Sequence, residues 1–560
     1  FCFIIHYVFN MKNVCYSLMV LLFFFASCKE NGTEPIVKPP KLTINEVRIN
    51  GRQWFNNSTV TDISITQKPI VEIKFSNAFD IAKFNKSMVS FSGEIGQNYN
   101  IAGSSDNKTL IINVNVLPKE LTKYSFNINQ GDNLGGYVNP NFSAEFTTQL
   151  DSTYKFPEIA NEELLTLVQK QTFKYFWDYG HPVSGLARER LSSGETVTMG
   201  GSGFGIMAVI VGIERGFITR QQGFERLNKI VNFLSNNADR FHGAFPHWMN
   251  GSTGKVLPFS TKDDGADLIE TAFLIQGLLT IQSYFDTGNN DEQIMCSNIQ
   301  KLWEEVEWNW FQKNNENVLY WHWSPNYNWD MNMHITGWNE GLIAYVLAAS
   351  SPTFPISKNV YTEGWAKNGA IKNGNKYYDI KLPLGENLGG PLFFAHYSFL
   401  GLDPRNLSDQ YASYWEQNMA HSKINYNYCV NNPNHFVGYS KDCWGLSASD
   451  IPGGYTASSP TNDNGTITPT AALASFPYTP TESMRALNFY YYVLGDKLWG
   501  DYGFKDAFNL SNKWVADSYL AIDQGPIIVM IENYRSALLW NLFMKQQDIK
   551  NGLTMLGFSY

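Results

Sequence analysis

The hydrophobic period of this chain changes near residue 155, and that change restricts its fold more than any other feature. Between residues 41 and 150, apolar and polar residues alternate in short runs such as 71–75 and 110–114, which are separated by Asn, Gly and Asp. Alternation with a period of two is typical of half-buried strands, so this part predicts a small β-sandwich. In residues 155–560, apolar residues recur every three or four positions, which predicts a mainly α second domain.

Helical periodicity continues through the second domain. Leu164, Leu165 and Val168 begin the first amphipathic segment, and long loops rich in Gly, Pro, Asn and aromatic residues separate it from later ones. Ten or more helices without strands between them indicate helical hairpins in a toroid, a count that an (α/α)6 barrel fits although periodicity alone does not specify it. Such loops are where sites usually lie. The further predicted helices cover 203–216, 221–237, 266–285, 292–309, 336–350, 391–400, 407–421, 481–494 and 532–547.

Charge and aromatic content narrow the function. The chain has 42 Lys and Arg against 51 Asp and Glu, a formal net charge of −9, which argues against a nucleic-acid partner because phosphate contacts need clustered cations. It also has 16 Trp, 30 Tyr and 38 Phe. Aromatic faces suit the stacking of sugar rings, but a large aromatic core would explain the same composition. Composition alone does not choose between the two.

The first 40 residues predict export from the cytoplasm. Residues 1–27 have the pattern of a secretory signal peptide, in which Lys12 precedes an apolar run and Met11 is the expected start. Small residues lead to Cys28 as in a bacterial lipobox, which predicts a lipid-anchored outer-membrane lipoprotein, either periplasmic or surface-exposed. An ordinary signal peptide with an incidental Cys is the alternative. Residues 28–40 would then form an extended linker.

No motif predicts a cofactor. Beyond the anchor region the chain keeps Cys296, Cys429 and Cys443, and the last two could pair to close a loop in an oxidising compartment. There is no CxxC motif, no Cys/His cluster, no phosphate-binding Gly-rich motif after a strand, and no HExxH or GxSxG. We therefore expect neither a metal nor a cofactor.

Three carboxylates with regular spacing form the strongest candidate site. Asp263, Asp267 and Glu270 stand at positions i, i+4 and i+7, which places them on one face of a helix or of its entry loop. Crowded carboxylates repel one another and tend to have raised pKa values, as a proton donor at neutral pH requires. Helix capping is the alternative, and it is strongest for Asp263 and Asp264.

A second candidate combines aromatic residues with a glutamate. Glu340 stands at the start of an apolar helix and follows a segment rich in Trp and His. Glycosidases need aromatic platforms for sugar rings and an acid whose surroundings keep it protonated. Core aromatics with Glu340 as a capping residue would give the same pattern. The predicted substrate-binding residues of this segment are Trp321, Trp323, His334 and Trp338.

Weaker candidates lie on other loops. His247 and Trp248, with Arg188-Glu189-Arg190 earlier in the chain, have the residue types of sugar subsites, although a lone His or Trp is more often structural; of the earlier segment, Arg188 is the predicted substrate-binding residue. Trp444 and Tyr455 lie on another long loop and complete the predicted substrate-binding set. Asp523 precedes an apolar segment and is a candidate base.

Several of these motifs resemble one bacterial family. Over residues 158–550 the chain resembles the glucoamylase-like family, and in particular the β-1,2-glucanases of glycoside hydrolase family 144. The strand at 142–148 resembles the last strand of bacterial Ig-like modules. The motifs that carry the family resemblance are Gly203-Phe204-Gly205, Gly212-Ile213-Glu214-Arg215-Gly216, the segment of Asp263, Asp267 and Glu270, Trp338-Asn339-Glu340, Ala348-Ala349-Ser350-Ser351-Pro352-Thr353, Gly364-Trp365, Asp523-Gln524-Gly525-Pro526 and Glu532-Asn533-Tyr534-Arg535.

The resemblance implies an (α/α)6 barrel, preceded by a small Ig-like β-sandwich, that hydrolyses β-1,2-glucan, endo-acting or by release of sophorose. In the family, acids at Asp263, Asp267, Glu270 and Glu340 are implicated. We expect inversion with Glu340 as acid, with Asp267 or Glu270 as base before Asp523, and a monomer. A hydrolase of another glucan linkage and a non-catalytic surface glycan-binding lipoprotein are alternatives. An acidic, aromatic cleft argues against a polysaccharide lyase, whose anionic substrate needs Arg and Lys.

Overall fold

The computed structural model describes residues 39–560. The predicted signal peptide, residues 1–27, lies outside the described residues, and so do Cys28 and all but the last two positions of the predicted linker 28–40. Export and lipid anchoring therefore stay predictions.

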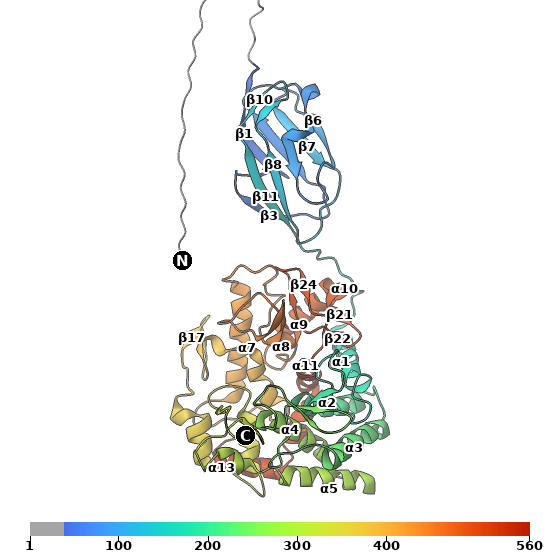
Figure 1. Cartoon of the computed structure of the whole chain (residues 1–560), viewed down its shortest axis with the longest axis vertical. Helices are drawn as coiled ribbons and strands as arrows, with labels where there is room; N and C mark the ends of the chain where they lie inside the picture. Colours follow the sequence, from blue (N-terminus) through green and yellow to red (C-terminus); the bar gives the residue numbers. More distant parts are fainter. Residues whose placement is uncertain (1–38) are drawn as a thin grey trace, which may run out of the picture. The chain divides into compact units, whose positions relative to one another are not determined.

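The described chain forms two compact units, one rich in strands and one mainly helical (Figure 1). This division follows the change of hydrophobic period, since short alternating runs form the strands and the three-to-four-residue pattern forms the helices. The β unit consists of residues 39–118 and 123–147, and the helical unit of residues 119–122 and 148–560.

Two sheets build the β unit. One has the strand order β6-β7-β4-β1-β10-β9, with β2 also paired to β1, and the other has the order β3-β11-β8-β5. Burial alternates along the strands, so every second residue of each sheet points inward. These residues, among them Ile73 and Phe126, form one core together with Trp54. The strands are β1 (Lys41–Ile49), β2 (Arg52–Gln53), β3 (Thr59–Ile63), β4 (Ile70–Phe75), β5 (Val89–Phe91), β6 (Tyr99–Gly103), β7 (Thr109–Val114), β8 (Lys123–Ile128), β9 (Gly131–Asn133), β10 (Gly136–Asn139) and β11 (Phe142–Thr148).

Four apolar helices form the interior of the helical unit. Their sequences are hydrophobic on nearly all sides, so they are stable only when other helices surround them. The first two of them, at Met199–Glu214 and Leu268–Phe285, pack so closely that a Cβ on Gly203 would lie 2.2 Å from the carbonyl oxygen of Phe273. The second is long and apolar enough to cross a membrane, but 89% of it is buried within the unit, as in a core helix. The four are α2 (Met199–Glu214), α4 (Leu268–Phe285), α6 (Leu342–Ser350) and α11 (Ala521–Ser536).

Other helices surround this interior, and α3, α5 and α13 lie at the periphery of the unit (Figure 1). Their apolar residues occupy one side only, as expected for helices that cover a core. These helices are α1 (Asn161–Trp177), α3 (Arg220–Asn236), α5 (Asn290–Glu304), α7 (Tyr414–Asn431), α8 (Pro469–Leu473), α9 (Pro480–Asn488), α10 (Gly495–Leu498), α12 (Leu538–Phe543) and α13 (Gln547–Leu556).

Short strand pairs stiffen the long loops between the helices. The predicted helix at 391–400 is wrong, because that segment forms two separate 3-10 turns, η7 (Leu392–Ala395) and η8 (Tyr397–Phe399). The strands are β12 (Thr196–Thr198), β13 (Trp248–Asn250), β14 (Val256–Leu257), β15 (Ala266–Asp267), β16 (His322–Trp323), β17 (Lys376–Tyr377), β18 (Ile380–Lys381), β19 (Ala448–Ile451), β20 (Gly454–Ala457), β21 (Trp499–Gly500), β22 (Gly503–Phe504), β23 (Phe508–Asn509) and β24 (Trp514–Val515).

The cysteines of the helical unit are unpaired. Cys296, Cys429 and Cys443 are free thiols buried in apolar surroundings, so the possible Cys429–Cys443 disulfide does not form. Burial raises the pKa of Cys296 to about 11, which makes this thiol a poor nucleophile.

Candidate active site

A cavity of about 390 Å³ lies where the four interior helices begin. Thr198 directly precedes α2, Glu270 stands in the first turn of α4, and Glu340 directly precedes Gly341 and α6. Leu520 precedes α11. Helix N-termini present free N–H groups and positive dipole ends, so the fold places carboxylates where backbone donors are available. The cavity is lined by Glu189, Arg190, Thr198, His247, Trp248, Phe259, Ile269, Glu270, Phe273, Trp321, Glu340, Phe393, Tyr397, Ala448, Tyr455, Leu520 and Ile522.

Glu270 is fixed by hydrogen bonds from the start of α2. Its Oε2 accepts the Gly200 N–H at 2.6 Å and the Thr198 hydroxyl at 3.1 Å. A Cβ at position 200 would lie 2.9 Å from the same oxygen, so only glycine leaves room for this carboxylate. Burial, and then the negative charge of Asp267, raise the pKa of Glu270, whereas His247 and the two donors act against this shift.

His247 lies between Glu270 and a pair of buried aspartates. Its Nδ1 donates to Asp267 Oδ2 at 2.9 Å, and its Nε2 lies 4.0 Å from Glu270 Oε1. Burial alone would favour a neutral imidazole, but the negative charges of Glu270, Asp267 and Asp263 raise the pKa of His247 to about 9. His247 therefore carries a positive charge at neutral pH and partly neutralises these acids.

Asp267 and Asp263 lie behind the cavity wall. Asp267 Oδ1 caps α4 by accepting the N–H groups of Ile269 and Glu270 at 3.0 Å each. Burial would raise the pKa of Asp267, but the hydrogen bond and charge of His247 lower it. Burial and the charge of Asp267 raise the pKa of Asp263 to about 7. Asp263 Oδ2 lies 3.4 Å from the Nε2 of His322, another buried side chain.

Side chains of this cluster could also hold a cation. One ligand atom from each of His247, Asp263 and Asp267 lies within 4.8 Å of the others. An imidazole nitrogen and two carboxylate oxygens suit a divalent transition metal. The 2.9 Å hydrogen bond from His247 to Asp267 accounts for that pair without an ion. Hydrogen bonding and charge balance are therefore sufficient to explain the pair.

Glu340 faces the same cavity from the start of α6. Protein surrounds its carboxyl group, although part of the residue is exposed to the cavity. Burial, opposed by a backbone hydrogen bond and supported by the charges of Asp267 and Glu270, raises the pKa of Glu340 to about 7. This residue can hold a proton near neutral pH, as a general acid must.

A second group of acids lies beside α11. Asp523 is in the first turn of α11 and is only 1% exposed, and within residues 39–560 the side chain that hydrogen-bonds its carboxyl group is that of Asp506. Burial and the nearby Asp506 raise the pKa of Asp523 well above its usual range, and burial raises the pKa of Asp506 to about 7. Arg190 Nη1 donates to Asp450 Oδ1 at 3.0 Å, and Asp450 N donates to Asp506 Oδ2 at 2.7 Å. Arg190 thus connects the cavity to this group.

The structure brings together only part of the predicted site. His247, Trp248, Trp321, Tyr455, Glu270 and Glu340 line the cavity, whereas Asp263, Asp267 and Asp523 lie buried next to it. The remaining predicted residues do not line it. Arg188 donates to the carbonyl groups of Gly194 and Tyr179, Trp323 packs on His242, His334 is exposed beside Tyr320, Trp338 stacks on Phe399, and Trp444 is a core residue that donates to the carbonyl of Glu482.

Some cavity residues had not been predicted, and the segment Arg188-Glu189-Arg190 contributes members other than the expected Arg188. Glu189 and Arg190 line the cavity, whereas Arg188 does not. Phe259 stacks on His247 with ring centroids 4.1 Å apart and precedes the carboxylate motif by four positions. Phe273, Phe393 and Tyr397 come from apolar segments, and no local signal separates them from core residues.

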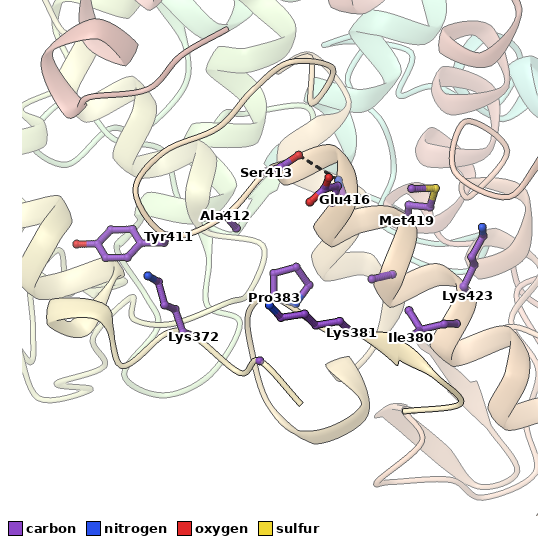
Figure 2. A pocket seen from close by; sticks show the side chains of 12 residues that line it. Lys372, Ile380, Lys381, Pro383, Tyr411, Ala412, Ser413, Glu416, Met419 and Lys423 are labelled. Carbon is purple, nitrogen blue, oxygen red and sulfur yellow. Dashed lines mark hydrogen bonds between the residues drawn. The ribbon is translucent and has the colours of Figure 1, made fainter. Parts of the chain in front are cut away.

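A larger hollow in the helical unit does not have the features of an active site. Its volume is about 570 Å³, and it lies between the β17–β18 hairpin and α7 (Figure 2). Lys372, Lys381 and Lys423 line it, together with apolar side chains, and Glu416 is its only carboxylate. An acid and a base cannot be drawn from a single carboxylate, so the smaller cavity remains the candidate active site.

Comparison with known proteins assigns the family. The family model Glycoamylase, described as "Putative glucoamylase", matches residues 332–547. An exo β-1,2-glucooligosaccharide sophorohydrolase (non-reducing end) of Parabacteroides distasonis is 47% identical over 428 residues, which are 72% of this chain and 59% of that protein. The structure of the endo-β-1,2-glucanase of Chitinophaga pinensis with sophorotriose and glucose is 52% identical, covers 72% of this chain and 99% of its own, and superposes with a TM-score of 0.71. The chain belongs to the glucoamylase-like family.

Another solved member of the family comes from Bacteroides uniformis and carries the same description as the family model. It is 58% identical, with a TM-score of 0.71, and the match covers 72% of this chain and 99% of that one. The chain spans 59% of the length of the curated Parabacteroides relative. The part that the family model matches includes Glu340, Tyr397 and Asp523.

Proposed function

We propose that this protein is a glycoside hydrolase that cleaves β-1,2-glucan. One observation carries the proposal: Glu270 and Glu340, two carboxyl groups with raised pKa values, face one aromatic-walled cavity. Glycoside hydrolysis needs one carboxyl group that holds a proton and one carboxylate, on opposite sides of the scissile bond. Support for the linkage comes from the β-1,2-specific names of the Parabacteroides and Chitinophaga relatives.

Glu340 is the general acid of the proposed mechanism. Its proton goes to the glycosidic oxygen as the C–O bond breaks, while a carboxylate on the opposite side of the sugar removes a proton from the attacking water. Glu270 is the base that this geometry favours, because it lines the cavity and hydrogen bonds hold its carboxylate in place. Asp267 is less suited, since helix capping and His247 occupy both of its oxygens.

Inversion is part of the proposal. An inverting pair leaves room for a water molecule and lies about 6.5–9.5 Å apart, whereas a retaining pair lies about 5–5.5 Å apart. NMR of the first product formed gives the anomer directly. The α-anomer from a β-linked glucan supports inversion, and the β-anomer contradicts it.

An (α/α)6 barrel is the architecture we infer for the helical unit. The support is that α2, α4, α6 and α11 all begin at the cavity, so these interior helices run in the same direction. Outer helices such as α3 connect them, which is the pattern of repeated helical hairpins. Membership of glycoside hydrolase family 144, lipid anchoring through Cys28 at the outer membrane and a monomeric state rest on the sequence alone.

Product analysis of the protein without residues 1–27 tests the function. Incubation with linear β-1,2-glucan is expected to give short β-1,2-oligosaccharides, and β-1,3-glucan, β-1,4-glucan and starch serve as comparison substrates. Product sizes over time distinguish endo action from release of sophorose. Glu340→Gln is expected to bind short oligosaccharides and to release product about 10²- to 10⁴-fold more slowly. Hydrolysis of starch alone would overturn the linkage, and binding without release from any glucan would favour a glycan-binding protein.

A further inference from the structure

Tyr397 places a hydroxyl group without a partner in the wall of the cavity. The residue is 5% exposed, lines the cavity, and makes no side-chain hydrogen bond within residues 39–560. The hydroxyl oxygen is not one of the fully buried polar atoms that lack a partner, so it is accessible from the cavity. A ligand in the cavity can therefore bind it. A buried hydroxyl left unpaired costs free energy, which makes an uncompensated one in a cavity wall a feature that needs an explanation.

Packing fixes the position of this hydroxyl. The ring of Tyr397 stacks on Phe393 with centroids 5.1 Å apart, and it contacts Phe204 at 5.3 Å and Phe273 at 5.6 Å. Its backbone carbonyl accepts a hydrogen bond of 3.2 Å from Gln276. A polar group held this rigidly is preorganised for a ligand, because little side-chain entropy is lost when the ligand binds.

The side chain of Tyr397 is close to acids of both groups. Burial, and then the nearby ionisable groups of Asp523, Tyr455, Glu340 and Asp506, raise the pKa of Tyr397 well above its usual range. The group therefore stays protonated and can both donate and accept a hydrogen bond. Glu340 and Tyr397 line the same cavity, and Asp523 lies buried beside it at the start of α11, so the hydroxyl of Tyr397 is available to a sugar bound in this cavity.

We propose that Tyr397 binds substrate directly: its hydroxyl hydrogen-bonds a hydroxyl group of the glucose unit next to the bond that is cleaved. This inference rests on the proposed function, since it names a contact within the same site. A site that hydrogen-bonds a substrate hydroxyl holds the sugar in one orientation, and loss of that bond impairs the reaction more than it impairs folding.

Tyr397→Phe tests the inference because it removes only the oxygen. We expect kcat/KM on β-1,2-oligosaccharides to fall about 10- to 100-fold, as for a lost hydrogen bond to substrate, with the position of the pH optimum unchanged. Tyr478→Phe is the matched control. Tyr478 is also buried, but its hydroxyl contacts Asn418 and the carbonyl of Ala395 and does not line the cavity, so its loss should lower Tm and leave kcat/KM within about twofold.

A second measurement separates contact with substrate from structural support. Wild type is compared with Tyr397→Phe on a series of oligosaccharides that each lack one hydroxyl group. The two proteins should cleave one of these deoxy substrates equally well, namely the one that lacks the hydroxyl group to which Tyr397 binds. On that substrate the Tyr397 hydroxyl has no partner, so its removal costs nothing. If wild type cleaves β-1,2-glucan and the variant matches it on every substrate, the inference is wrong. If wild type cleaves no glucan, the proposed function is wrong, and the inference about Tyr397, which rests on it, is wrong as well.

Discussion

At the scale of single residues, Glu340 gives the sharpest prediction. Its pKa of about 7 means that the carboxyl is protonated below neutrality and loses its proton as the pH rises. Activity that needs this proton is present below pH 7 and should fall about tenfold per pH unit above it. The measurement is kcat/KM on β-1,2-oligosaccharides between pH 5 and 9, in which an acid with an ordinary Glu pKa would already lose activity near pH 5.

Substitution of the same residue provides the control. Glu340→Gln should lower kcat by about 10²- to 10⁴-fold, because the amide cannot donate a proton to the leaving oxygen. Glu363→Gln is the matched variant, since Glu363 is exposed and its Oε2 accepts only a hydrogen bond from Asn317. Its activity and pH profile should equal those of the wild type. An alkaline limb that stays in place in Glu340→Gln would assign the titration to another group.

Residue spacing predicted that three acids lie close together, but it could not have predicted the side chains and backbone groups around them. The i, i+4, i+7 pattern placed Asp263, Asp267 and Glu270 together, and all three meet around His247. The hydrogen bond that holds Glu270 comes from Gly200, 70 positions earlier, and no local pattern encodes it. Trp444 was predicted to bind substrate, but it is a buried core residue. The sequence could not have separated these two roles, because a core indole and a sugar platform give the same pattern.

At the scale of elements, the start of α4 joins stability to chemistry. Asp267 caps the helix with Oδ1 and holds His247 with Oδ2. Asp267→Asn keeps an oxygen that can cap the helix, whereas Asp267→Ala removes it, and both lose the charge opposite His247. The Ala variant should therefore be less stable than the Asn variant by about 1 kcal/mol. Urea unfolding of the two proteins measures this difference, and equal midpoints and slopes would exclude capping as a source of stability.

Helix boundaries were less predictable than helix positions. The predicted helix at 532–547 is wrong at its start, since α11 begins at Ala521 and continues through Pro526. A Gly-Pro pair normally ends or precedes a helix, but here dense packing of apolar residues on all sides of α11 outweighs that preference. The predicted helix at 391–400 was wrong because periodic apolar residues do not by themselves specify an α-helix. In this segment they pack as two separate 3-10 turns.

At the scale of the whole molecule, composition indicated two uses of aromatic residues, and the structure contains both. Trp303, Trp308 and Trp540 are buried in the core, whereas Trp248 and Trp321 line the cavity. The predicted stacking surface is therefore a small part of the aromatic content. Which rings face the cavity depends on how the loops before the interior helices meet, and that is decided by contacts far apart in sequence.

Each unit has its own core, and this gives the last prediction. The core of the β unit contains only residues between Leu42 and Phe146, and every cavity-lining residue lies between 189 and 522. A chain that begins at Thr148 loses only residues 119–122 of the helical unit, none of which lines the cavity, and should therefore fold and keep kcat/KM on short β-1,2-oligosaccharides within about twofold of the longer protein. Scanning calorimetry should show one unfolding transition fewer. Intact helical circular dichroism with activity lost would mean that the β unit takes part in catalysis.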